Sequence, residues 1–175
     1  MGRGSLYSSP FFYLCSCSTS GSASDLSIKF NERNMNSKNI GNLTELQCLA
    51  SFVKNGCNVC IPYGDNSKYD FIADYNGTLY KIQVKTSSIK QGTNDAISFS
   101  CRSTHVNCKG VKNIKYTKED IDYFATIWDN QCYVIPVEEC SNEKILRFKP
   151  PKNGQIKGIT FAEKYKIENV LGGSS

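Results

Sequence analysis

The segment from Tyr69 to Lys85 constrains the fold of this chain most, because it predicts a β-hairpin of fixed register. Asn76-Gly77 is the favoured pair for a two-residue type I′ turn, in which both central residues take positive φ. A turn of that length places Asp70 directly opposite Gln83. The hairpin therefore gives the first fixed relation between residues that are distant in sequence.

Alternation of side chains along each strand divides this hairpin into two faces. An apolar face, which predicts a core contact, carries Tyr69, Phe71, Ala73, Tyr75, Tyr80, Ile82 and Val84. A more polar face carries Asp70, Ile72, Asp74, Leu79, Lys81, Gln83 and Lys85. Antiparallel hairpins often place charges on a solvated face. The polar face is therefore compatible with an ordinary surface or with a site built from Asp70, Gln83 and Lys85.

The rest of the chain predicts an α/β (α+β) domain, a mixed central sheet flanked by helices. A helix is expected over 42–55, with an apolar stripe of Leu43, Leu46, Leu49, Ala50 and Val53. Further strands are expected at 57–63, 96–102, 125–129, 132–137 and 145–148. A second helix is expected to start at 117–120, and a third over 162–169, with Thr160 and Glu163 as a capping box.

Glu45 is a further candidate site residue, because it shares a helix face with Leu49 and Phe52. That position directs it toward the margin of the sheet rather than straight into water. An alternative is that Asn42 and Glu45 form a capping box at the start of the helix.

Length and composition predict one domain, preceded by an N-terminal segment of different composition. The chain has 175 residues, of which 39% are hydrophobic, enough for a packed core. Nine serines fall within the first 27 residues. We expect a disordered leader over 1–39, or sequence upstream of a true start at Met35, then a domain over 40–171 and a flexible tail over 172–175. No apolar run is long enough to span a bilayer, so an intracellular, cytoplasmic and nucleoid-associated protein is expected.

The net charge of +5 is concentrated in one stretch. Between Arg102 and Lys118 there are five cationic residues and no Asp or Glu. Such a block favours contact with a polyanion, although a solvated loop has the same composition.

The nine cysteines are most simply explained as buried free thiols. Cys57-x-x-Cys60, with His105 further along, raises the alternative of a zinc site, but zinc is disfavoured because no second CxxC follows.

Taken in order, Gly41-x3-Glu45, Tyr69-Asp70 and Gln83-Val84-Lys85 resemble the PD-(D/E)xK nuclease pattern. The chain is similar, over roughly 38–171, to the endonucleases of this superfamily that are associated with group I introns. Additional similarity lies in Ile82-Gln83-Val84-Lys85-Thr86, Asp120-Ile121-Asp122-Tyr123-Phe124-Ala125 and Tyr133-Val134-Ile135-Pro136-Val137. Tyr69 stands where the superfamily has Pro, and Gln83 where it commonly has Asp or Glu. The intron-associated family resembles this chain in having Gln there.

The resemblance implies a restriction-endonuclease-like core and a Mg²⁺-dependent, site-specific DNA endonuclease of the homing type, with Mn²⁺ as an alternative metal. Asp70 would be the principal metal ligand, and Gln83 would ligate through its side-chain oxygen. Glu45 would help to bind a cation or a water, and Lys85 would orient the attacking water or stabilise developing negative charge.

Double-stranded DNA is the expected partner, bound by a homo-oligomer, either a dimer or a tetramer. The strand pair at 125–137 and the C-terminal helix are the candidate oligomer interface. Candidate DNA contacts are Lys68, Ser87, Lys90, Arg102, His105, Lys109, Lys112, Lys115 and Tyr116. A Holliday-junction resolvase, a restriction-type nuclease, a catalytically decayed DNA-binding module and an interaction protein that keeps the fold remain alternatives.

Overall fold

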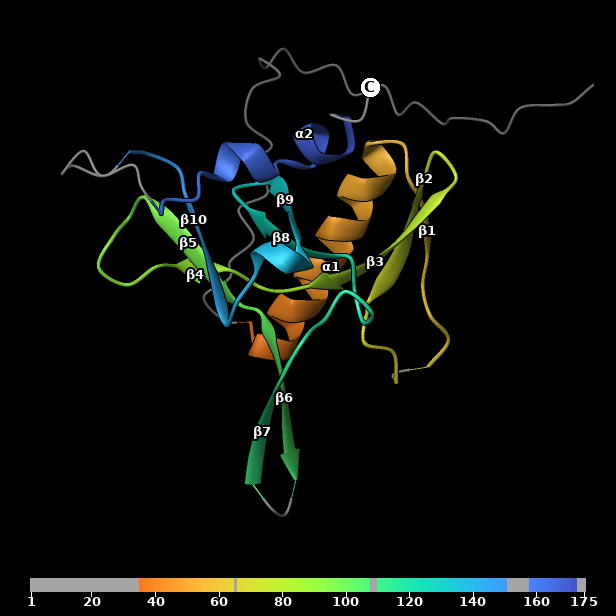
Figure 1. Cartoon of the computed structure of the whole chain (residues 1–175), viewed down its shortest axis with the longest axis horizontal. Coiled ribbons are helices and arrows are strands. Elements are labelled where there is room, and N and C mark those ends of the chain that lie inside the picture. The colour runs from red at the N-terminus through yellow and green to blue at the C-terminus, as the bar shows by residue number, and fades with distance from the viewer. Residues whose placement is uncertain (1–34, 65, 108–109, 151–157, 173–175) are drawn as a thin grey trace, which may run out of the picture. The chain divides into compact units, whose positions relative to one another are not determined.

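The computed structural model describes residues 35–64, 66–107, 110–150 and 158–172, which fold as one compact unit (Figure 1). Its helices are α1 (Ser37–Lys54) and α2 (Ile167–Gly172), with short 3-10 turns η2 (Val137–Glu139) and η3 (Ala162–Tyr165). Its strands are β1 (Asn58–Cys60), β2 (Phe71–Tyr75), β3 (Thr78–Val84), β4 (Ser88–Ile89), β5 (Ala96–Ser100), β6 (Arg102–Asn107), β7 (Gly110–Lys115), β8 (Tyr123–Trp128), β9 (Gln131–Pro136) and β10 (Glu143–Arg147).

The central layer is a five-stranded mixed sheet in the order β1-β2-β3-β8-β9. Strands β3 and β8 run parallel, and the other neighbours run antiparallel. A three-stranded sheet, β10-β5-β4, and a two-stranded ribbon, β6-β7, complete the described strands. The predicted mixed α/β class is confirmed.

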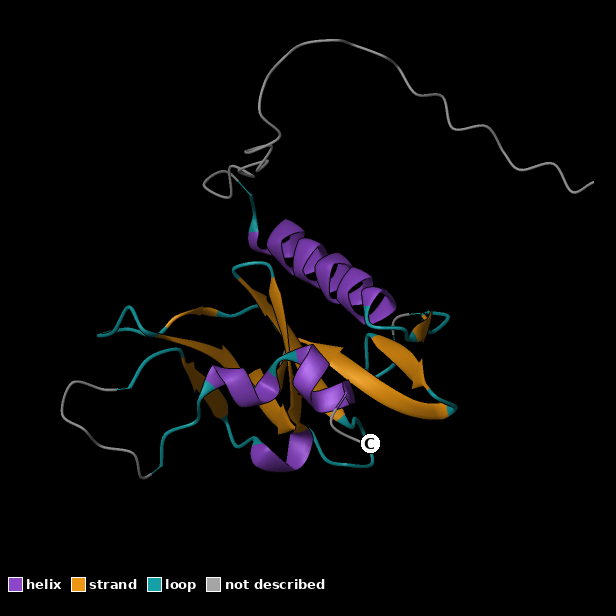
Figure 2. Ribbon diagram, turned by 90° about the horizontal axis from the view of Figure 1, so that it is seen from above, coloured by secondary structure: helices purple, strands orange, loops and turns teal. Residues whose placement is uncertain are grey.

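Two hydrophobic clusters cover the two faces of the central sheet. On one face, Cys48 and Phe52 of α1 and Leu171 of α2 pack against apolar residues of β2, β3, β8 and β9. On the other face, Phe124 of β8 packs with residues of β5 and β10. Figure 2 shows α1 lying along one side of the strands. The domain therefore has helix, central sheet and smaller sheet as successive layers.

The hairpin register expected from the sequence is confirmed. Asn76 and Gly77 have φ of 52° and 81°, and Phe71 pairs with Ile82 as a two-residue turn requires. The Asp74 carboxylate accepts a hydrogen bond of 3.0 Å from the Gly77 amide, which stabilises the turn.

The prediction for the first helix is wrong in its start and, apart from Leu49, which packs against the core, in its buried face. The helix begins at Ser37, and Asn36 caps it by accepting a 2.9 Å hydrogen bond from the Asn39 amide. The side chains facing the core are Thr44, Cys48 and Phe52, which follow each other at four-residue spacing. In the predicted stripe, Leu46 and Val53 are 63% and 54% exposed. Apolar residues occur on more than one side of this helix, so their spacing does not identify the buried side.

The helix expected to start at 117–120 is absent from the structure, which has a turn there. The Asp120 carboxylate accepts a hydrogen bond of 3.1 Å from the Thr117 amide, as in a capping box, and the Ile121 amide closes a single turn on the Thr117 carbonyl at 3.1 Å. Asp122 then accepts one of 2.8 Å from the Lys81 amide, and β8 begins at the next residue. The chain has no room for a helix between these two attachments.

Three smaller expectations are also corrected. The predicted strand at 57–63 is limited to β1, and the predicted strand at 96–102 divides at Cys101 into β5 and β6. The C-terminal segment forms η3 and α2, preceded by Phe161 with no side-chain capping bond, so the predicted capping box is wrong.

Several other expectations fall partly outside the described residues. Residues 1–34 of the predicted leader and residues 173–175 of the predicted tail lie outside them, while 37–39 belong to α1 and Gly172 to α2. The described cysteines are all free thiols, and five of these six are buried. No helix in the described ranges is long and apolar enough to cross a membrane.

Candidate active site

The centre of the candidate site is a hydrogen-bonded cluster where β2 meets β3. The Oδ2 atom of Asp70 accepts 2.6 Å and 2.7 Å hydrogen bonds from the Val84 backbone amide and the Gln83 side-chain amide. Gln83 also donates to the Val84 carbonyl at 3.2 Å, and its side chain is only 9% exposed. The hairpin register sets Asp70 beside Gln83, as the sequence predicts, although this end of the polar face is covered rather than solvated.

Burial controls the ionisation of the Asp70 carboxyl. Desolvation raises the pKa of Asp70, while the Val84 hydrogen bond, the Lys85 charge and the Gln83 hydrogen bond lower it in part. Because the pKa of Asp70 is raised despite these contacts, a cation bound nearby would stabilise the ionised form of its carboxyl.

Lys85 lies on the same face, next to Asp70. Burial lowers the pKa of its amine, and the negative charge of Asp70 counteracts that effect. The Nζ atom lies 5.2 Å from the centre of the Tyr116 ring, and no described residue forms a hydrogen bond or an ion pair with it. The ammonium therefore experiences the charge of Asp70 without forming an ion pair with it, and no described residue occupies its hydrogen-bond donors.

Glu45 joins the cluster from α1. Burial, and to a smaller degree the negative charge of Asp70, raises the pKa of Glu45. Asp70 therefore influences the ionisation of Glu45. Because the helix starts at Ser37, Glu45 lies well inside it, and the alternative that it caps the N-terminus is wrong. A 3.3 Å hydroxyl contact between Thr44 and Thr86 ties this part of the helix to the chain just after β3.

The oxygen atoms of this cluster fit a hard divalent cation. The carboxylates of Glu45 and Asp70 are hard oxygen donors of the kind that bind Mg²⁺ or Mn²⁺. The amide oxygen of Gln83 would join them once the amide turns, because Nε2 faces Asp70 and Oε1 faces Tyr116. In the described ranges Oδ1 of Asp70 accepts no hydrogen bond, so that oxygen is available as a ligand. No group of three or more His, Cys, Asp and Glu suits a metal ion in the described part of the chain. Gln83 has an amide where Asp or Glu would add a third carboxylate, so the cluster has only two acids.

Three residues predicted to contact DNA are already engaged with protein groups. Lys68 forms a 2.6 Å ion pair with Asp120, and Lys90 forms one of 2.7 Å with Glu143. Ser87 donates a 3.1 Å hydrogen bond to the carbonyl of Ile127 on β8. Their roles in DNA contact remain predictions.

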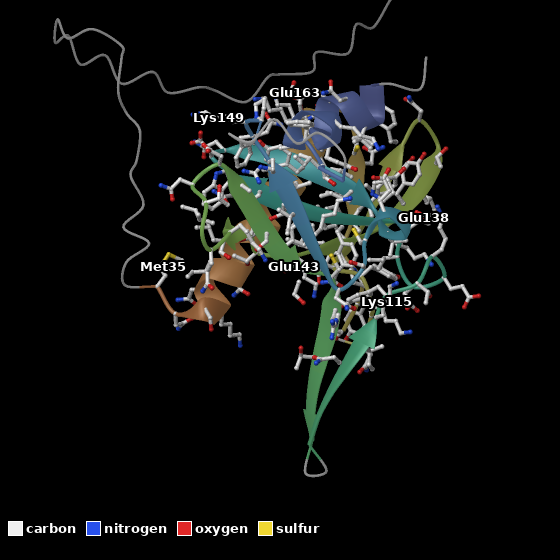
Figure 3. All side chains as sticks on the ribbon, turned by 60° about the vertical axis from the view of Figure 1, so that its left-hand side comes forward. Met35, Lys115, Glu138, Glu143, Lys149 and Glu163 are labelled. Carbon is white, nitrogen blue, oxygen red and sulfur yellow. The ribbon has the colours of Figure 1, made fainter. Side chains whose placement is uncertain are left out.

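The basic stretch forms the β6-β7 ribbon, which extends away from the sheets (Figure 1). Arg102 is directly paired with Lys115, and the backbone of His105 is paired with that of Lys112. No described acidic residue forms an ion pair with Arg102 or Lys115. Figure 3 labels Lys115 where the ribbon joins the rest of the domain. Lys109 lies outside the described residues.

Tyr116 is the site residue whose place sequence reasoning missed. We predicted it as a DNA contact from its basic surroundings, yet it lies over the site and donates a 3.3 Å hydrogen bond to Oε1 of Gln83. Its ring also packs edge-on against Phe124, with centroids 5.4 Å apart. Only the path of the ribbon brings it there, and no motif in the sequence marks that path.

The fold and this cluster define a nuclease of the PD-(D/E)XK class, and the comparison with known families agrees. The profile of the PD-(D/E)XK endonuclease family matches residues 35–168. The chain belongs to that family and is a DNA endonuclease. Nucleases of this family generally use divalent metal ions.

Among solved structures, the fold is similar to that of a bacterial homing endonuclease, I-Ssp6803I. The TM-score is 0.64 at 22% sequence identity, and the match covers 81% of this chain and 98% of that one. This likeness confirms the expected restriction-endonuclease-like fold. No curated protein sequence matches the chain.

Proposed function

We propose that this endonuclease is a Mg²⁺-dependent, site-specific enzyme of the homing type, which also accepts Mn²⁺. The observation that carries the proposal is the cluster of Asp70, Gln83 and Lys85 on one hairpin, joined by Glu45 from α1. The similarity in fold to the bacterial homing endonuclease I-Ssp6803I supports the homing type, and an association with a group I intron is part of the proposal.

The roles of the residues follow from their contacts. Asp70 and Glu45 would hold the cation with oxygen atoms, and Gln83 would add a neutral oxygen ligand. When bound, the cation polarises the scissile phosphate and lowers the pKa of water. Lys85, which is close to Asp70 and has free donors, orients the attacking water or stabilises negative charge on the phosphate.

The ribbon is the proposed DNA-binding element. Like charges directly opposite in an antiparallel pair destabilise it by about 0.2–1 kcal/mol. Arg102 and Lys115 form such a pair, and no described acid compensates them. Phosphate groups would supply the missing negative charge. A two-stranded ribbon also fits the major groove of DNA.

A polar cavity beside the ribbon extends the proposed DNA path. It has a volume of about 390 Å³ and is lined by Thr86, Ser88, Ser98, Phe99, Ser100, Arg102, Asn113, Asn142 and Glu143. Thr86 follows Lys85 directly, so the cavity continues from the candidate active site toward the ribbon. Hydroxyl, amide and guanidinium groups are typical donors to the sugar-phosphate backbone.

A homo-oligomer, a dimer or a tetramer, is part of the same proposal. A single domain of this size offers limited area for a long DNA site, whereas specific complexes bury about 1,000–2,500 Å² of protein. Sedimentation equilibrium of the purified protein, with and without DNA, measures the assembly directly. A strictly monomeric protein on its target DNA would contradict it.

Cleavage tests the proposal with four proteins: wild type, Asp70→Ala, Lys85→Ala and the control Lys54→Ala. Each is incubated with plasmid DNA carrying candidate intron-insertion sites, in Mg²⁺, Mn²⁺ or EDTA. We expect cutting at one site by wild type and Lys54→Ala, in either metal but not in EDTA. Both site variants should retain DNA binding without cutting, since the proposed DNA contacts lie elsewhere.

Two other outcomes favour other functions. Cutting of four-way junctions in preference to any linear site would identify a junction resolvase. Sequence-specific binding without cleavage in either metal would identify a decayed DNA-binding module.

A further inference from the structure

We infer that Tyr116 is a positioning residue of the nuclease centre, which orients the Gln83 amide with its hydroxyl and restrains the Lys85 ammonium with its ring. This inference rests on the proposed function, since Gln83 and Lys85 are the residues that it concerns. It assigns to Tyr116 a role different from the DNA contact expected from the sequence.

The ring of Tyr116 is fixed by the core. It follows the last residue of β7 and is half-buried, with its edge against the ring of Phe124 on β8. Gln83 and Phe124 are paired residues of the neighbouring parallel strands β3 and β8. Tyr116 therefore packs across β3, which carries Gln83, and across its neighbour β8.

The hydroxyl of Tyr116 completes the hydrogen bonding of the Gln83 amide. Nε2 of Gln83 donates to Asp70 and to the Val84 carbonyl, and Oε1 accepts from Tyr116. Among the described residues no other group donates to Oε1. Because the side chain is buried, a missing partner there leaves a polar atom unsatisfied.

A hydroxyl suits a glutamine at this position, because it both donates and accepts. Rotation of the amide by half a turn exchanges its two polar atoms and directs the oxygen toward Asp70, where a cation ligand is needed. Nε2 then faces the Tyr116 hydroxyl, whose oxygen can accept a hydrogen bond from it. A buried amide donor without an acceptor is rarer in proteins than a carbonyl without a donor. Loss of the hydroxyl therefore disfavours the ligating orientation more than the observed one.

The ring of Tyr116 provides the second contact. Nζ of Lys85 lies 5.2 Å from its centroid, within the range of a cation–π interaction. Among the described residues no hydrogen bond or ion pair to that ammonium competes with this ring, and the charge of Asp70 acts on it from farther away. The same side chain thus limits the motion of the two residues that flank Val84.

The test compares Tyr116→Phe, which removes only the hydroxyl, with Tyr116→Leu, which also removes the ring. The control is Tyr123→Phe, a half-buried tyrosine that packs against Tyr80. The first measurement uses metal-free protein labelled with ¹⁵N at glutamine side chains, with the Gln83 signal identified by its loss in Gln83→Glu. Tyr116→Phe should shift the Gln83 amide signals, and Tyr123→Phe should leave them in place.

Two further measurements separate positioning from DNA contact. Tyr116→Phe should weaken Mn²⁺ binding in calorimetry about tenfold, as is typical when a partner of a metal ligand is lost. It should lower kcat by a similar factor while the Kd for DNA remains unchanged. Tyr116→Leu should lower kcat further, because the Lys85 contact is lost as well.

Two results would overturn the inference: an unmoved Gln83 amide signal in Tyr116→Phe, or a fall in DNA affinity equal to the fall in cleavage. The second would make Tyr116 a DNA contact. If wild type cuts no DNA with either metal, the proposed function fails, but the amide signal of the metal-free protein still decides whether Tyr116 orients Gln83.

Discussion

Replacing Asp70 with Asn should abolish cleavage and yet stabilise the metal-free fold. Burial raises the pKa of Asp70 above its ordinary value of 3.8, so the folded state holds this proton more tightly than the unfolded chain does. The contribution of Asp70 to stability therefore falls as pH rises from 3.8 through the raised pKa, and it stays low at neutral pH. Asn carries no charge, and its oxygen can still accept the bonds from Val84 and Gln83.

We expect Asp70→Asn to gain about 0.5–2 kcal/mol of stability at pH 7, the range typical of a single stabilising substitution. At roughly 3 °C per kcal/mol for a domain of this size, the melting temperature should rise by about 2–6 °C. Below pH 3.8, where both states of the wild type are protonated, the gain should disappear.

Adding Mg²⁺ should make the wild type melt at a higher temperature than Asp70→Asn. At a hundred times its Kd, a ligand that binds only the folded state stabilises it by about 2.7 kcal/mol. Wild type should gain this stability, and Asp70→Asn should not, because it lacks the principal ligand. Calorimetric melting of both proteins at pH 7 and pH 3.5, in EDTA and in Mg²⁺, measures the eight melting temperatures that this comparison needs.

Asp95→Asn is the matched control, since it removes one carboxylate whose nearest cation, Lys149, is 3.9 Å away. It should change neither the melting temperature nor the response to Mg²⁺ appreciably. A lower melting temperature for Asp70→Asn at pH 7 would refute the argument from burial. An undiminished Mg²⁺ response would refute the assignment of the ligand.

Three further variants have expected outcomes. Lys85→Met should lower cleavage by about 10²–10⁴-fold at unchanged DNA affinity, measured by gel assay and by filter binding; parallel losses would show a DNA contact instead. Gln83→Glu should lower the stability of the metal-free protein at pH 7 by about 1–3 kcal/mol, because Asp70 loses a hydrogen-bond donor and gains a neighbouring negative charge. The same change should tighten Mn²⁺ binding, and weaker Mn²⁺ binding would argue against a ligand at this position. The double change of Arg102 and Lys115 to Gln should raise stability by about 0.2–1 kcal/mol and reduce the salt dependence of DNA binding by about two phosphate contacts; an unchanged salt slope would exclude the ribbon from the interface.

The hairpin and its site residues were predictable because their relation is local. Asn76-Gly77 fixes the turn, the turn fixes the register, and the register brings Asp70 to Gln83. Glu45 could be placed at the margin of the sheet because it shares a helix face with Phe52, which is buried.

The errors concern contacts that local patterns do not encode. Thr44 and Cys48 face the core although Leu46 is more apolar, because the position of the sheet, rather than residue type, selects the buried side. The turn at Thr117 is set by Asp120 and by the attachment of Asp122 to β3, a contact between residues 41 positions apart. Tyr116 reaches Gln83 for the same kind of reason, across 33 positions.

The parallel pairing of β3 with β8 allows the β6-β7 ribbon to change in evolution separately from the candidate site. Parallel neighbours need a long crossover connection, and here that connection carries the whole β6-β7 ribbon between Lys85 and Tyr123. The ribbon can therefore be lengthened, shortened or exchanged while both ends of the connection stay anchored in the same sheet. On the proposed function, a change in the ribbon would alter the DNA target while the candidate site on the hairpin and α1 stays in place.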